Sequence, residues 1–149
     1  MTMASGLYTV TFRDAINDGT PITMDLTNAN NLVALYTDTK TPVFDTDAAY
    51  SSTNELPTAG GYTQISKTVG GTPTCALGSV AHTLKYSWST TVSWTSATFT
   101  ARGMIVHTVT ATKLPIVAAT FGADYTATNG TFTITAHADG IFYITMSAT

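Results

Sequence analysis

The stretch Val92–Val106, VSWTSATFTARGMIV, alternates apolar or small residues with threonine and serine, which is the period of two expected of a β-strand. The apolar residues up to Trp94 fall in one phase, and those from Ala97 onward fall in the other. The phase slips between these two residues and again near Gly103, and each slip predicts a bulge or bend that re-aims the side chains. We therefore expect one long strand, or two, with Trp94 and Phe99 anchoring the core.

The composition favours the same fold class. Charged residues make up 10% of the 149 residues, where about 25% is usual, and 33 residues are threonine. Threonine is β-branched and fits the pleated, half-buried surface of a sheet. We expect an all-β chain, an antiparallel β-sandwich or barrel, that forms a single domain over residues 1–149.

Short runs of strand-forming residues elsewhere support this architecture. The further expected strands are Ile22–Leu26, Leu32–Tyr36, Tyr62–Val69, Val80–Trp88, Leu114–Phe121, Thr131–Ala136 and Ile141–Met146. The expected turns are Asn28–Asn31, Gly70–Pro73, Asn129-Gly130 and Asp139-Gly140. Short strands at near-regular spacing, joined by turns rich in Gly, Asn, Asp and Pro, are typical of β-sandwiches and barrels.

Helical spacing appears in one place, Leu7–Asp18, LYTVTFRDAIND. The residues that would share its apolar face are Leu7, Val10, Ala15 and Ile16. Ser5 is placed to cap the start of this helix, and Gly19 lies where a helix stops. Although Tyr8–Phe12 is rich in strand formers, we expect a short helix that covers the sheet.

The least regular segment is Thr37–Tyr62, TDTKTPVFDTDAAYSSTNELPTAGGY, which we refer to as loop 37–62. It carries four acidic residues, two prolines and a pair of glycines, so we expect a long surface loop with one helical turn at Asp45–Ser51. Long loops in compact domains are often functional. This loop is therefore the first candidate for a functional surface.

The charges narrow the range of partners. Six basic residues are spread singly along the chain and the net charge is −3, which argues against nucleic acid as a ligand. The sequence has neither a polybasic cluster nor an apolar run of about 20 residues, so it gives no indication of membrane binding. The start, MTMASGLYTV, lacks the basic region and long apolar core of a secretory signal, so we expect a protein kept in the cytoplasm or released by lysis.

Motifs for catalysis, cofactors or metals are not found in the sequence. Cys75 is alone and lacks a nucleophile signature, so we interpret it as a small buried hydrophobe. His82, His107 and His137 are 25 and 30 residues apart, which is not the spacing of a helical metal site, and we interpret them as sheet-surface or core residues. The acids around Asp45 lack the rest of a calcium loop. We expect no enzymatic activity, no cofactor and no metal.

Five blocks of the sequence carry a resemblance to a known family. They are Phe12–Gly19, Asn31–Glu55, Gly60–Thr63, Val92–Val106 and Pro115–Gly122. They contain a short helix ending in Gly, an "ALYTD…P…D…NE…GYT" strand and loop, a "W-x-x-A-T-F-x-A-R-G" strand and a strand ending in "FG". This succession resembles a family of small structural proteins of tailed bacteriophages. The resemblance implies a place on the virion, as a capsid decoration or minor head protein or as part of the tail, and it carries over no catalytic or binding residue.

A place on the virion implies particular partners. They would be the major capsid protein or other virion proteins, and the chain would form a homo-oligomer, with a trimer favoured for a threefold position. A hydroxyl-rich surface with few charges would dock without the cost of desolvating ions. Binding only to the assembled lattice would stabilise that lattice by mass action.

Two classes of function stay open on these grounds. The first is a virion structural protein, most simply a head decoration, with the tail as the alternative place. The second is a carbohydrate-binding β-sandwich displayed on the virion, with aromatic residues around loop 37–62 as stacking platforms. These aromatic residues are Tyr36, Phe44, Tyr50 and Tyr62. We favour the first class, in which the same residues anchor the loop or contact other subunits.

Overall fold

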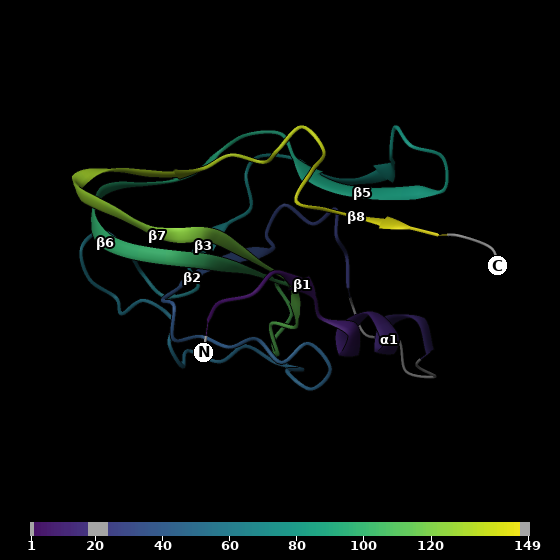
Figure 1. Ribbon diagram of the computed structural model, residues 1–149, viewed down its shortest axis with the longest axis horizontal. Coiled ribbons are helices and arrows are strands. Elements are labelled where there is room, and N and C mark those ends of the chain that lie inside the picture. The colour runs from purple at the N-terminus through teal and green to yellow at the C-terminus, as the bar shows by residue number, and fades with distance from the viewer. Residues whose placement is uncertain (1, 18–23, 147–149) are drawn as a thin grey trace.

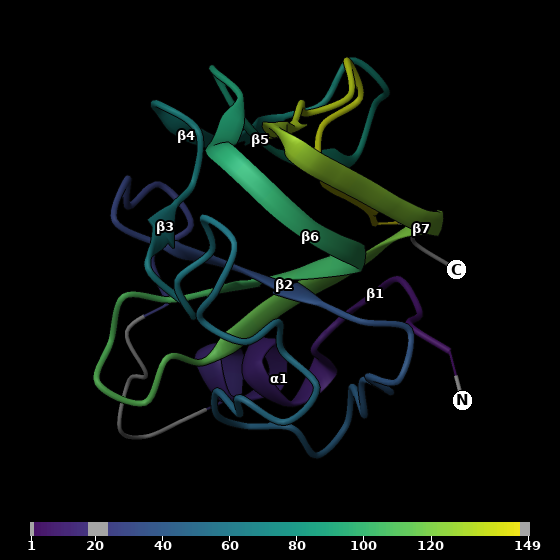
Figure 2. The ribbon, with the colours of Figure 1, turned by 90° about the vertical axis from the view of Figure 1, so that its left-hand side faces the viewer.

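The computed structural model describes residues 2–17 and 24–146, which form one short helix and two antiparallel sheets that do not close into a barrel. The helix and strands are β1 (Gly6–Leu7), α1 (Thr9–Asn17), β2 (Leu32–Tyr36), β3 (Lys67–Thr68), β4 (Pro73–Leu77), β5 (Thr83–Trp88), β6 (Val92–His107), β7 (Pro115–Ile134) and β8 (Phe142–Thr145). One sheet has the order β1-β7-β6-β2-β3 and the other the order β4-β5-β8. In Figures 1 and 2 the three-stranded sheet lies towards the top and α1 towards the bottom. The expected β-rich, antiparallel class is confirmed.

The long pair β6 and β7 dominates the five-stranded sheet. The two strands pair from Val92 opposite Ile134 to His107 opposite Pro115. Register shifts interrupt the ladder between Trp94 and Ala97 and again just before Gly103, which confirms both bulges expected from the phase of the sequence. At the second shift the four residues 121–124 of β7 lie opposite the single residue Arg102 of β6, and Figure 2 shows both strands bending sharply there.

The main core cluster contains residues of both sheets, and Trp94 is one of its buried members. This side chain is 3% exposed, and its ring packs edge to face against Phe99 at 6.5 Å and Phe132 at 6.0 Å between centroids. Tyr86 and Trp88 of β5 belong to the same cluster. Trp94 is thus a core anchor as expected, while Phe99 is partly buried and packs against the core.

The end of the chain differs from the sequence prediction in one respect. The strands expected at 114–121 and 131–136 belong to one strand, β7, and the turn expected at Asn129-Gly130 is wrong. Asn129 has a φ of 48°, and its backbone N–H donates to Oγ1 of Thr98 at 3.0 Å. Since asparagine tolerates the left-handed region, it forms a bulge beside the register shift between Ala97 and Phe99 instead of reversing the chain.

The helix also begins later than expected. It starts at Thr9, and Ser5 is not its cap, because Oγ of Ser5 accepts a hydrogen bond from the backbone N–H of Thr120 at 2.9 Å. The expected apolar face is only partly right, since Val10 is buried but Ile16 is 85% exposed. Gly19, the expected stop, lies outside the described residues.

The strand expected at Ile22–Leu26 is not formed in its described part. Ile22 and the residue after it lie outside the described ranges, and residues 24–26 are not in a strand. The carboxylate of Asp25 accepts a hydrogen bond from the backbone N–H of Thr27 at 2.9 Å, which stabilises a local turn in competition with a strand.

Among the remaining predictions, Leu32–Tyr36 is confirmed as β2 with the same bounds. The strands expected at 62–69, 80–88 and 141–146 are shorter, as β3, β5 and β8, and β4 was missed. The turns at 28–31, 70–73 and 139–140 are present, with positive φ at Gly71 and Gly140.

Candidate functional site

Loop 37–62 leaves β2 and returns alongside it. The backbone N–H of Thr37 donates to the carbonyl oxygen of Asn54 at 3.2 Å, and that of Leu56 donates to the carbonyl oxygen of Leu35 at 3.0 Å. An isolated antiparallel bridge pairs Tyr36 with Glu55 between them. These contacts fix both ends of the excursion on the same strand, so the segment between them is displayed from the five-stranded sheet.

The carboxylate of Glu55 lies beneath the loop and is 6% exposed. Its Oε1 accepts hydrogen bonds from the hydroxyl of Tyr62 at 2.5 Å and from the backbone N–H of Ile65 at 2.7 Å. Its Oε2 accepts one from the hydroxyl of Tyr50. A buried carboxylate is costly unless donors satisfy it, and hydrogen bonds to an ionised group are among the strongest in proteins. Through these hydrogen bonds Glu55 links Tyr50, Tyr62 and the backbone of Ile65.

The tyrosines around this carboxylate remain protonated donors. Burial and, next, the hydrogen bond to Glu55 raise the pKa of Tyr62 far above its ordinary value. The same two causes, in the same order, raise the pKa of Tyr50. Tyr62 also accepts a hydrogen bond from the backbone N–H of Leu35 at 2.9 Å, and its ring packs 5.8 Å from that of Phe99. This one side chain links the loop to both β2 and β6.

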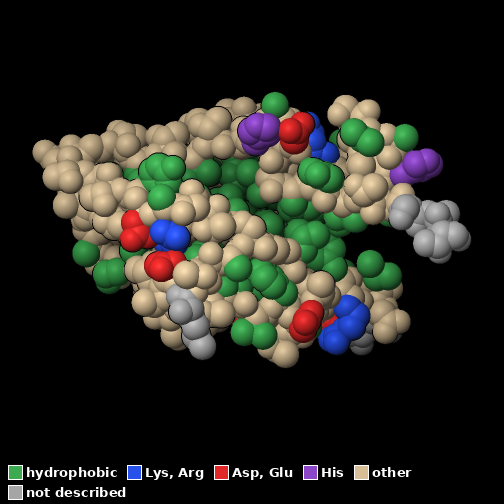
Figure 3. All heavy atoms as spheres, viewed as in Figure 1, with side chains coloured by type: hydrophobic (Ala, Val, Ile, Leu, Met, Phe, Trp, Pro, Cys, Tyr) green, Lys and Arg blue, Asp and Glu red, His purple; other side chains and the backbone are tan. Residues whose placement is uncertain are grey.

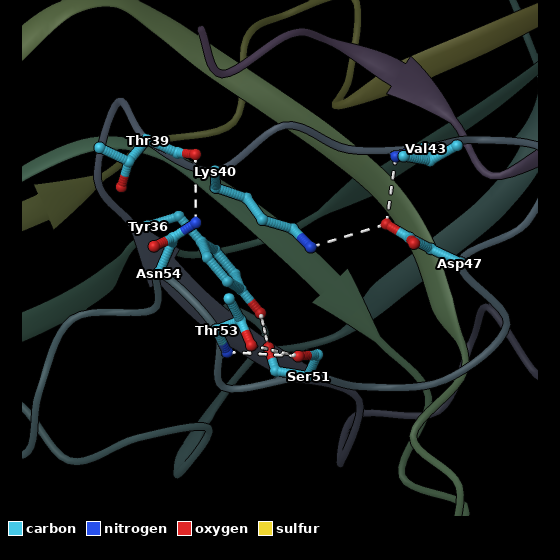
Figure 4. A network of polar contacts seen from close by, with 8 residues as sticks. All are labelled: Tyr36, Thr39, Lys40, Val43, Asp47, Ser51, Thr53 and Asn54. Atoms are coloured by element: carbon cyan, nitrogen blue, oxygen red, sulfur yellow. Dashed lines mark hydrogen bonds and ion pairs between the residues drawn. The ribbon is translucent and has the colours of Figure 1, made fainter. Parts of the chain in front are cut away.

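A second polar network holds the outer part of the loop (Figure 4). The hydroxyl of Tyr36 donates to the carbonyl oxygen of Ser51 at 3.1 Å. Nζ of Lys40 lies 5.8 Å from the centroid of the Tyr36 ring and 3.6 Å from Oδ2 of Asp47. The amide of Asn54 donates to the carbonyl oxygen of residue 39 at 3.1 Å. Figure 4 shows Lys40 crossing the loop interior between Tyr36 and Asp47.

Phe44 joins the loop to the start of α1. Its ring packs edge to face against that of Tyr8, with centroids 5.2 Å apart. Its carbonyl oxygen accepts hydrogen bonds from the backbone N–H of Val10 at 3.2 Å and from Oγ1 of Thr9 at 3.1 Å. The loop thereby satisfies one of the backbone donors that the first turn of a helix leaves unpaired. The helical turn expected at Asp45–Ser51 is not formed there; a single turn lies earlier, at residues 43–47, where the carbonyl oxygen of Val43 accepts a hydrogen bond from the backbone N–H of Asp47 at 2.9 Å.

Tyr50 packs against a buried histidine. Its ring lies 5.5 Å from that of His107, edge to face, and His107 is 1% exposed. Burial lowers the pKa of His107 from 6.5 to about 3; a backbone hydrogen bond to Ile105 opposes this shift, and Lys40 and Lys113 add to it. His107 is therefore a neutral core residue, as expected, whereas His82 and His137 are exposed.

Arg102 connects the loop to the bend of β6 and β7. Its Nε lies 3.4 Å from Oδ1 of Asp38, and its Nη1 lies 3.5 Å from Oδ1 of Asp124. Asp38 belongs to the "ALYTD" motif and Arg102 to the "A-R-G" motif, so the fold brings together two motifs that are far apart in the sequence. Partly exposed pairs of this kind contribute about 1 kcal/mol each, and they fix the position of the loop relative to the bend.

The four aromatic residues singled out in the sequence lie in one region with different exposure. Tyr36 and Tyr62 are 1% and 2% exposed, and Phe44 and Tyr50 are half-buried. All four hold the loop in place within the chain, and their role as assembly contacts stays a prediction. The loop presents other side chains to solvent, among which Val43 is 47% exposed.

Sequence reasoning missed Glu55, although it is the only glutamate of the chain and directly precedes Leu56 and Pro57. An acidic residue within an irregular, polar segment is usually solvated, so its burial could not be anticipated. Arg102 and Lys40 were noted only as dispersed charges. Cys75 is partly rather than fully buried, and burial raises the pKa of its thiol.

A groove of about 510 Å³ lies between the edge strands β1 and β8. Leu7, Val117, Ile141 and Phe142 are among the residues that line it, and Figure 3 shows hydrophobic side chains gathering in a hollow in the middle of this face. His137 and Asp139, 3.2 Å apart, lie at its rim.

Within residues 2–17 and 24–146, no group of three or more His, Cys, Asp or Glu side chains is placed to hold a metal ion. In the same ranges, no helix has the length and hydrophobicity needed to cross a membrane. Comparisons of the chain with protein-family models, with curated proteins and with solved structures give no match.

Proposed function

We propose that this chain is a non-enzymatic structural protein of a tailed-bacteriophage virion, a capsid decoration or minor head protein that binds and stabilises the assembled capsid. Loop 37–62 forms the surface that contacts the major capsid protein. The mechanism is mechanical, because a protein that binds the assembled lattice and not the free subunits shifts the equilibrium towards the lattice. The chain acts as a homo-oligomer on the particle, where a threefold position favours a trimer.

The observation that carries this proposal is the fixation of loop 37–62 by residues of the motifs that resemble virion proteins. Glu55 of the "NE" motif bonds to Tyr62 of the "GYT" motif at 2.5 Å, and Asp38 lies 3.4 Å from Arg102 of the "A-R-G" motif. A long loop held by buried hydrogen bonds loses little conformational entropy when a partner binds. Pre-organisation of this kind suits a loop that docks on a lattice.

The exposed part of the loop fits a protein contact with a low desolvation cost. Its exposed positions are mostly threonine, serine and alanine, together with the half-exposed Val43. Hydroxyl and small apolar groups can be buried at lower cost than ionised groups. The tail is the alternative place on the virion, because the same surface chemistry would serve there.

The carbohydrate-binding alternative relied on the loop aromatics as stacking platforms. A sugar stacks on the open face of a ring, and Tyr36 and Tyr62 are 1% and 2% exposed. Their rings are occupied by contacts within the chain, including Lys40 over Tyr36 and Trp94 beside Tyr62. The geometry therefore favours the structural role over glycan binding.

Co-sedimentation with phage heads that lack this protein tests the proposal. We expect saturable binding at a fixed copy number per head and a higher temperature of head disruption when the protein is bound. Val43→Glu adds a charge on the exposed loop and should weaken binding by about tenfold or more, since a buried unpaired charge is costly.

Val80→Glu is the matched control, because Val80 is 65% exposed between β4 and β5, away from the loop. It should bind heads like the unaltered protein. Absence of binding to heads would overturn the decoration proposal, and binding to tails lacking the protein would assign it to the tail. If Val43→Glu and Val80→Glu weakened binding to heads equally, loop 37–62 would not be part of the contact.

A further inference from the structure

The second half of β7, residues 125–134, has no strand neighbour on the side away from β6 within the described part of the chain. On one side β7 pairs with β6 along its length, whereas on the other side β1 pairs only with Val117 and Ala118. The five-stranded sheet therefore ends at β7 from residue 125 onward. Figure 2 shows this half of β7 on the outer side of β6. Outward-facing backbone N–H and C=O groups of such an edge are free to pair with another strand.

The end of this edge lacks the side chains that commonly keep sheet edges apart. Edges are protected by lysine, proline or inward-pointing charges, and residues 130–136, GTFTITA, contain none of these. The threonines are exposed and alternate with the buried side chains of Phe132 and Ile134. The bulge at Asn129 limits the regular part of the edge to these residues. A short segment of high β-propensity and no charge is the kind that pairs with an identical copy of itself.

A groove of about 530 Å³ follows the same edge. It is lined by Phe121, residues 125–127 and residues 130–135. Tyr125 is 54% exposed, and its ring lies 6.3 Å from that of Phe121, edge to face. A strand laid along the edge would gain backbone hydrogen bonds from β7 and apolar contact in the groove, which is how added strands obtain both affinity and register.

We propose that residues 130–136, the end of β7 and the two residues that follow it, pair antiparallel with the same residues of a second copy of this chain. The two five-stranded sheets then join across a twofold axis into one continuous sheet. The charge of the chain argues for a second copy at this place. Each copy carries a net charge of −3, and this segment lets two copies meet without bringing carboxylates together. Threonine opposite threonine is a favourable cross-strand pair, whereas like charges directly opposite each other are destabilising.

The size of the contact sets its expected strength. Specific interfaces bury about 1,200–2,000 Å² of surface in total. A short pair of strands alone buries less surface than this, so side chains in the groove, such as Tyr125, must add to the contact. We therefore expect association that depends on concentration. A twofold contact gives an even number of chains, so the trimer proposed for the particle would require a second contact. The inference concerns the free protein and does not depend on attachment to a virion.

Sedimentation velocity and light scattering of the free protein, from about 1 µM to about 1 mM, test this pairing. We expect a monomer–dimer equilibrium, with amide hydrogen exchange in residues 130–136 slowing as the dimer forms. The double variant Thr131→Lys, Thr135→Lys places like charges across the axis and should raise the dissociation constant at least about tenfold. Thr74→Lys, at an exposed threonine on the edge strand β4, is the matched control and should leave the dissociation constant unchanged.

Circular dichroism of each variant verifies that the fold is retained. A protein that stays monomeric throughout, or a trimer that the double variant leaves intact, would overturn the inference. It would also fail if Thr74→Lys weakened association as much as the double variant. Slow exchange of residues 130–136 only on phage heads, with a monomer in solution, would assign the edge to a strand of another protein. Failure to bind heads would contradict the decoration proposal but not the pairing of residues 130–136, so the two proposals can be tested independently.

Discussion

The hydroxyl of Tyr62 donates a hydrogen bond to Oε1 of Glu55 at 2.5 Å and accepts one from the backbone N–H of Leu35 at 2.9 Å. One oxygen atom thus joins the end of loop 37–62, its buried carboxylate and the central strand β2. Because the Tyr62 ring also packs against Phe99 of β6, the loop and the sheet should unfold as one cooperative unit. Substitutions at these residues and at their neighbours test this coupling.

Glu55→Gln should destabilise the protein by about 2–4 kcal/mol, because hydrogen bonds to a charged acceptor are worth about 1.5–3 kcal/mol each. The amide also turns one acceptor oxygen into a donor, which faces the hydroxyl or N–H groups that now bond to Glu55. Urea unfolding measures the loss. Asp14→Asn, at a partly exposed residue that pairs with Arg13, should cost less than about 0.5 kcal/mol. A cost for Glu55→Gln as small as that of this control would contradict the role assigned to the carboxylate.

Tyr62→Phe should cost about 1–3 kcal/mol, because it leaves the backbone N–H of Leu35 without its acceptor and removes one donor from Glu55. The ring contacts with Trp94 and Phe99 are retained, so the loss reports the hydroxyl alone. Tyr125→Phe removes a hydroxyl at a 54% exposed position and should change stability by less than about 0.5 kcal/mol. Hydrogen exchange of the Leu35 amide gives a second measure, and an unchanged rate in Tyr62→Phe would count against the bond.

His107 should make stability fall as the solution becomes acidic. Its pKa is about 3 in the folded protein and near 6.5 when unfolded, so the unfolded state takes up the proton first. The stabilisation is fully present above pH 6.5 and is lost as the pH falls towards 3. The expected loss from this group is about 2 kcal/mol between pH 7 and pH 5.

Urea unfolding at several pH values measures this dependence. His107→Gln cannot take up the proton, so its stability should depend less on pH over this range, whatever its absolute stability. His137→Gln, at an exposed histidine beside Asp139, should keep the slope of the unaltered protein. Identical slopes in all three proteins would show that His107 is not the group responsible.

Gly103→Ala should destabilise the bend of β6 by about 1–3 kcal/mol through overpacking. A Cβ at this position would lie 2.7 Å from the carbonyl oxygen of Ala119, a backbone atom of the paired strand, and 2.7 Å from Cγ of Met3. Gly130→Ala is the control, because the nearest atom to its Cβ would be the carbonyl oxygen of Thr128 at 3.8 Å. Thermal unfolding compares the two variants. Equal midpoint temperatures would show that the backbone at the bend can move to accommodate the added methyl group.

The strands that local alternation specifies were the ones that the sequence predicted best. β6 and β2 were predicted to within a residue, and both bulges of β6 were located, because alternation and its interruptions are local properties. β4 was missed because Pro73–Leu77 has no alternation, and its conformation follows from pairing with β5, with Cys75 opposite Tyr86. The signal at Asn129 is compatible with a turn or a bulge, and the partner strand decided between them.

The candidate site was predictable as a region but not in its chemistry. The length and irregularity of loop 37–62 pointed to it, and its aromatic residues were identified. The burial of Glu55 depends on donors from Tyr50, Tyr62 and Ile65, which only the folded chain brings to one place. The exposed fraction of each aromatic side chain of the loop could not be predicted from the sequence either, because it depends on which neighbours cover the ring.

By itself the sequence determined the β-rich class, the surface with few charges, the two bends in β6 and the position of the long loop. Each of these depends on residue type and short-range spacing. Only the tertiary structure decided that β7 runs unbroken to Ile134, that Tyr36 and Tyr62 face inward and that residues 125–134 form an open sheet edge. The physical reason is that strand pairing and burial are set by contacts between segments far apart in the chain, such as Val92 with Ile134, and local spacing does not encode those partners.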